Sequence, residues 1–91
     1  MADATAFIPT ESACRLLDRF CRHWSQRFEV EHDETHGYVD FGAAQCSMSA
    51  HCEQLAVTVH AEESELERLQ QMIGEQLEQM AEKEALEIVW C

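Results

Sequence analysis

The 91-residue chain carries 18 acidic and 6 basic side chains, a formal net charge of −12, and 46% of its residues are hydrophobic. A charge of this sign repels a phosphate backbone, and no apolar run approaches the roughly 20 residues that span a bilayer, so we expect neither nucleic acid nor a membrane as partner. The length predicts a single domain, residues 1–91, with room for a hydrophobic core.

The first third of the chain predicts a strand followed by a helix. Ala4 to Ile8 is a short apolar run that Pro9 ends, as expected for a strand. Thr10 is a suitable N-cap for a helix in which apolar residues recur at steps of three and four. The predicted buried stripe of this helix consists of Ala13, Leu16, Leu17, Phe20, Cys21 and Trp24.

Beyond Gln26 the period of the pattern changes to two, which is typical of strands with one buried face. Apolar and polar residues alternate in the runs 28–31, 38–41, 46–51 and 55–60. The stretch HDETHG makes the first turn, and GAAQ and CEQ are short enough to connect hairpins. The pattern predicts an antiparallel meander.

A Ser-x-x-Glu capping box at 64–67 predicts the start of a second helix. Its predicted buried stripe consists of Leu66, Leu69, Ile73, Leu77 and Met80, with Glu residues on the solvated face. Alternation then predicts a last strand at 86–90. Arg15, Arg19 and Arg22 form a basic ridge on the first helix, and we expect this ridge to face acidic residues of the second.

These elements predict an α+β fold of order β-α-β-β-β-α-β. In this arrangement two helices lie on one face of a mainly antiparallel sheet and form a two-layer sandwich with it. The other face of the sheet then stays open to solvent.

With these elements in place, the chain resembles the bacterial domain-of-unknown-function family 2218 over nearly its whole length. The matching pieces are CRHW at 21–24, GYVDFG at 37–42, CSMSA at 46–50 and LEIVW at 86–90. The resemblance implies bacterial iron uptake as context, since related domains occur beside or fused to siderophore-interacting proteins. It implies no established activity.

The second helix departs from the family's pattern. The resemblance implies a His-Leu-x-x-Phe motif that falls here on residues 76–80, where the sequence reads QLEQM. If the family joins one His from each helix in a metal or haem site, Gln76 leaves His23 without its mate.

Five cysteines without a C-x-x-C pair argue against a disulfide framework and against a zinc knuckle. We expect reduced thiols, most of them buried. The first 13 residues have neither the basic nor the apolar region of a signal peptide, so we expect a cytoplasmic location.

The first helix offers a candidate motif in which a thiol and an imidazole, which can act as nucleophile, base or metal ligand, are close together in sequence. Cys21 and His23 are two residues apart and point about 200° away from each other on a helix, so one metal would need ligands from elsewhere, such as His51, Cys52 or His60. A metal or haem site around His23 and Cys21 is therefore the alternative hypothesis, and a nucleophilic Cys21 is a weaker one. We expect His23 to be structural instead, with its ring buried at the edge of the stripe.

The open face of the sheet is the preferred candidate site. The alternation places on it Tyr38, Asp40, Ser47, Ser49, His51, Thr58 and His60. We expect this polar, partly aromatic surface to contact a protein or a small ligand, a homodimer included. The sequence thus predicts a non-enzymatic binding or accessory module without a cofactor, with a link to iron or siderophore uptake implied by the family resemblance.

Overall fold

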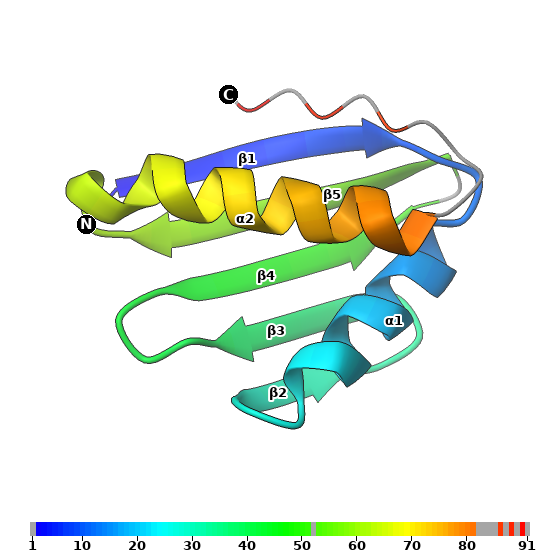
Figure 1. Ribbon diagram of the computed structural model, residues 1–91. Coiled ribbons are helices and arrows are strands. Elements are labelled where there is room, and N and C mark those ends of the chain that lie inside the picture. Colours follow the sequence, from blue (N-terminus) through cyan, green and yellow to red (C-terminus); the bar gives the residue numbers. More distant parts are fainter. Residues whose placement is uncertain (1, 52, 82–85, 87, 89, 91) are drawn as a thin grey trace.

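The computed structural model describes residues 2–51, 53–81, 86, 88 and 90. Figure 1 shows both helices on the same face of one sheet, as the predicted two-layer α+β fold requires. The elements are, in chain order, β1 (Ala2–Pro9), α1 (Ala13–Trp24), β2 (Glu29–His32), β3 (His36–Asp40), β4 (Gln45–Ala50), β5 (Gln54–Ala61) and α2 (Glu63–Ala81). The predicted fold class is confirmed.

The described chain has four strands between the two helices, where the predicted order had three. Each alternating run of the sequence is a separate strand, because a turn follows each of them. The strand predicted at 86–90 lies partly outside the described residues. Of this segment, Trp90 forms an isolated antiparallel bridge with Ala6 of β1.

The sheet has the strand order β1-β5-β4-β3-β2, and every neighbouring pair is antiparallel. Strands β2 to β5 form the predicted meander, and β1 adds to its far edge beside β5. Figure 1 shows α2 running along the β1 and β5 side, while α1 crosses the β2 and β3 side. Both helices therefore bury their apolar stripes against the same face.

The stripe predicted for α1 is confirmed, since all six of its residues are buried. The predicted N-cap is two residues too early, because α1 begins at Ala13 with Ser12 at the N-cap position. Thr10 instead holds the turn between β1 and α1. Its Oγ1 accepts the N–H of Ser12 at 3.0 Å, and its own N–H donates to the carbonyl of Glu53.

Helix α1 rests on β3 at Gly37. A Cβ atom at this glycine would lie 2.6 Å from the Sγ of Cys21 and 3.3 Å from Cδ2 of Leu17. The first distance is so short that the carbon and sulfur atoms would clash sterically. The absent side chain thus allows α1 to approach the strand, and Cys21 fills the space.

Helix α2 begins at Glu63, and the carbonyl of Glu62 accepts the first N–H groups of the helix. Ser64 therefore lies inside the first turn and not at the predicted capping position. Ile73 and Leu77 of the predicted stripe are fully buried, while its other members are half-buried. Neither described helix is long and apolar enough to cross a membrane.

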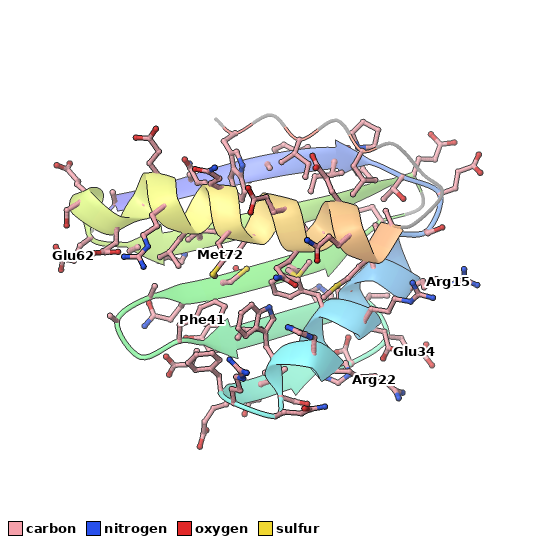
Figure 2. All side chains as sticks on the ribbon, in the orientation of Figure 1. Arg15, Arg22, Glu34, Phe41, Glu62 and Met72 are labelled. Atoms are coloured by element: carbon pink, nitrogen blue, oxygen red, sulfur yellow. The ribbon has the colours of Figure 1, made fainter. Side chains whose placement is uncertain are left out.

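The basic ridge of α1 makes contacts both within its own helix and with α2. Arg22 pairs with Asp18 of its own helix, with 3.0 Å between Nε and Oδ2. Arg19 donates to the carbonyl of Met80 at 2.8 Å, at the C-terminal end of α2, where the helix dipole concentrates negative charge. In Figure 2, Arg15 and Arg22 extend outward from α1.

We predict that Gly37→Ala destabilises the protein by about 1 to 3 kcal/mol, because the added methyl group overlaps Cys21 and Leu17. Urea unfolding measures the change. Gly74→Ala is the matched control: its Cβ would lie 3.7 Å from Cδ1 of Ile88, an ordinary contact, so the helical alanine should stabilise by about 0.5 to 1 kcal/mol.

Adding Cys21→Ala to the Gly37→Ala variant removes the nearest overlapping atom. The double variant should then lose less stability than the sum of the two single changes. Strict additivity would show that α1 does not depend on this contact.

Candidate functional site: the open face of the sheet

The strand register arranges the outward side chains of the sheet in three rows, on the face that both helices leave open. Figure 1 views the molecule from the helix side, so this open face is turned away from the reader. The middle row crosses all five described strands and consists of Glu31, Tyr38, Ser47, Thr58 and Thr5. Within it, the hydroxyl oxygens of Thr5 and Thr58 lie 3.2 Å apart.

The other two rows flank the middle row. On one side lie His36, Ser49, Ala56 and Phe7. On the other side lie Glu29, Asp40, Gln45, His60 and Asp3. The open face therefore has small side chains at its centre and larger or charged ones at its margins.

The structure brings together most of the residues that the sequence assigned to this face. Tyr38, Ser47 and Thr58 are consecutive in the middle row, and Ser49 lies in the row beside them. His51 does not join them. It lies in the turn after β4 and lines a cavity of about 480 Å³ with the first turn of α1.

Asp40 and His60 lie together in the third row, and both have local contacts. Oδ1 of Asp40 accepts the N–H of Gly42 at 2.8 Å. Gly42 has a φ of 92°, so this contact stabilises a turn that favours glycine. Nδ1 of His60 lies 3.7 Å from Oδ2 of Asp3 on the neighbouring strand.

Two adjoining hollows lie on the open face. The larger, of about 450 Å³, is lined by Glu31, His32, Asp33, His36, Gly37, Tyr38, Ser47 and Met48. The smaller, of about 180 Å³, is lined by His36, Ser47, Met48, Ser49, Ala56 and Thr58. They share His36, Ser47 and Met48, so they form one continuous depression over β3, β4 and β5.

Asp33 and His36 belong to this depression, and the sequence analysis missed them because it assigned HDETHG to a turn. Oδ1 of Asp33 accepts the N–H groups of Thr35 and His36 at 2.9 and 2.8 Å. These bonds, that of Thr35 foremost, lower the pKa of Asp33 and favour its carboxylate. The missed signal was parity: His36 is two residues before Tyr38, so it shares the same face of β3.

The α1 motif divides between the core and the surface. Cys21 is fully buried, and burial, with a smaller contribution from Asp18, raises the pKa of its thiol to about 11. His23 is exposed, which corrects the expectation of a buried ring. Among the described residues, no group of three or more His, Cys, Asp or Glu side chains is placed to hold a metal ion.

His23 packs its ring edge-on against Trp24, with 5.0 Å between the ring centroids. Trp24 also contacts Phe20, Phe28 and Phe41 at centroid distances of 5.2 to 6.2 Å. This aromatic cluster lies on the helix side of the sheet, where Figure 2 shows Met72 of α2 reaching toward Phe41. Nε1 of Trp24 is buried and has no hydrogen-bond partner among the described residues.

Comparison with known proteins places the chain in a family. The model of an uncharacterised protein family conserved in bacteria, DUF2218, matches residues 5–91. The chain is also similar to PA4090 from Pseudomonas aeruginosa, a protein with an NMR structure, at 36% sequence identity and a TM-score of 0.84. The similarity covers 100% of this chain and 96% of that one. No curated protein matches the chain.

We predict that Cys14 reacts fast with a thiol reagent at pH 8, whereas Cys21 and Cys46 react only through unfolding. Cys14 is exposed, while the other two are buried and their thiol pKa values are raised to about 11 and about 12. Labelling followed by mass spectrometry of a Cys52→Ser, Cys91→Ser variant measures the three rates. Fast labelling of Cys21 in the folded protein would contradict its placement.

We predict that Trp24→Ala costs about 3 to 5 kcal/mol of stability, as expected when a large side chain leaves a core. His23→Gln should change the free energy of unfolding by no more than about 0.5 kcal/mol, because His23 is exposed and its contact with the aromatic cluster is limited to the ring of Trp24. Urea unfolding of both variants, with and without zinc, iron and haem, provides the comparison. A ligand-dependent gain in stability that His23→Gln removes would support the metal or haem hypothesis instead.

Proposed function

The chain belongs to the uncharacterised bacterial family DUF2218, and we propose that it is a non-enzymatic binding module whose open sheet face docks a protein partner. The observation that carries this proposal is the pair Phe7 and Tyr38, the exposed large hydrophobic residues of the described chain. Both lie on the open face, at 53% and 41% exposure. Aromatic side chains of this kind are enriched in protein interfaces.

The floor between these two residues supports docking. It consists of the small side chains of Ser47, Ser49, Ala56 and Thr58. These leave the adjoining hollows between the larger residues at the margins. A complementary surface can therefore approach the sheet closely over β4 and β5.

The extent of the face favours a protein over a small ligand. Phe7 is on β1 and Tyr38 on β3, and β5 and β4 lie between them. Three strand spacings separate the two residues by roughly 14 Å. Phe7 lines neither hollow, so a small molecule held in the hollows has no built contact with it, whereas a protein surface or a bound peptide can contact Phe7 and Tyr38 together. Proteins of siderophore uptake are the first partners to screen, because the family resemblance implies that context.

Peptide display on the purified protein tests this proposal. The double variant Ser47→Arg, Thr58→Arg fills the floor of the face with long charged side chains and should lose the peptides that the parent protein selects. Gln71→Arg, Gln79→Arg is the charge-matched control, because both glutamines are exposed on α2. This control variant should still bind the peptides that the parent protein selects.

Selected peptides that bind the parent protein and the open-face variant equally would refute docking on this face. Sedimentation tests whether the occupant is a second copy of the chain. If the parent protein and the control variant are dimers and the open-face variant is a monomer, a second copy occupies the face.

A further inference from the structure

The larger hollow of the open face has a negative lining. It contains the carboxylates of Glu31 and Asp33, and none of its described lining residues is Lys or Arg. The contacts of Asp33 with Thr35 and His36 all go to Oδ1. Its Oδ2 takes part in none of them, and the side chain is 70% exposed. The hollow thus offers an ionised carboxylate oxygen to a ligand.

Tyr38 provides an aromatic surface in the same hollow. It lies between Glu31 of β2 and Ser47 of β4 in the middle row. Residues directly opposite each other on neighbouring antiparallel strands have Cβ atoms about 4.5 to 5.5 Å apart. A planar cation can stack on a tyrosine ring while its N–H groups donate to a neighbouring carboxylate. The guanidinium group of arginine has this shape and this set of donors.

We propose that this hollow binds an arginine side chain of the protein partner. The guanidinium group stacks on Tyr38 and donates to Glu31 and Asp33, while the remainder of the partner covers the floor toward Phe7. This inference rests on the proposed function and adds the chemistry of the partner: a protein that presents an exposed arginine beside an apolar surface.

Charge makes a second copy the poorer occupant. The outward residues of the described strands include the acids Asp3, Glu29, Glu31 and Asp40 and no Lys or Arg. Two such faces packed against each other would place like charges together, which disfavours the pairing. A basic partner instead finds complementary charge along the row that contains Glu29, Asp40 and Asp3, and in the hollow.

Titration with N-acetylarginine amide, followed by two-dimensional ¹⁵N–¹H NMR, tests the proposal directly. The amides of Gly37, Tyr38 and Ser47, which line the hollow, should shift in a saturable way. N-acetylcitrulline amide, which has the same shape without the charge, should leave them unchanged. Added salt should weaken the arginine titration, because exposed charges are screened.

Two variants separate the contributions to arginine binding. Tyr38→Leu and Glu31→Gln should each weaken it by about two- to fivefold, as expected for an exposed cation–π contact and an exposed ion pair. Glu67→Gln removes one negative charge from the exposed face of α2, outside the hollow. This control variant should bind arginine as the parent protein does. The spectra of the variants also show whether each remains folded.

Equal shifts with citrulline and arginine, or no saturable shift in the hollow, would overturn the arginine site. If peptides still depend on the open face in that case, the proposed function stands and only this inference fails. If arginine titrates the hollow but no peptide depends on the face, the proposed docking function fails instead.

Discussion

The contact between α1 and β3 at Gly37 determines how the two layers of this protein fit together. Only a residue without a side chain lets Cys21 and Leu17 come this close to the strand. Helix α1 is thereby seated over β2 and β3, and the space over β1 and β5 is left to α2. Because both helices use one face of the sheet, no described helix or strand forms a layer on the other face. The candidate site is a consequence of this one-sided packing.

The alternation of the sequence was sufficient to predict the layers and much of the site. Period two along β3, β4 and β5 separates buried from outward residues, so Tyr38, Ser47 and Thr58 could be assigned to the open face correctly. The helical period likewise identified every buried residue of α1. Both predictions rest on local periodicity, which needs no knowledge of the neighbouring elements.

The features that the sequence analysis missed depend on register and on turns. Which strand lies beside which, and hence that Glu31 is opposite Tyr38, is decided by pairing across the sheet. His36 was missed because β3 begins two residues before the apparent alternation. His51 continues the alternation of β4 in the sequence, yet the strand ends at Ala50, so parity assigned His51 to a face that it does not join. Thr10 failed as an N-cap because its hydroxyl serves a turn.

The edges of the sheet determine what kind of complex this protein can form. At one edge β2 is only four residues long and carries Glu29 and Glu31, and short charged edge strands are poor templates for a further strand. At the other edge Trp90 bridges to Ala6 of β1. Growth of the sheet into a shared ladder, a route to aggregation, is thus disfavoured at the β2 edge, and the Trp90 bridge occupies part of the β1 edge. A partner docked on the open face, as proposed, would contact side chains and would leave the backbone pairing of the sheet intact.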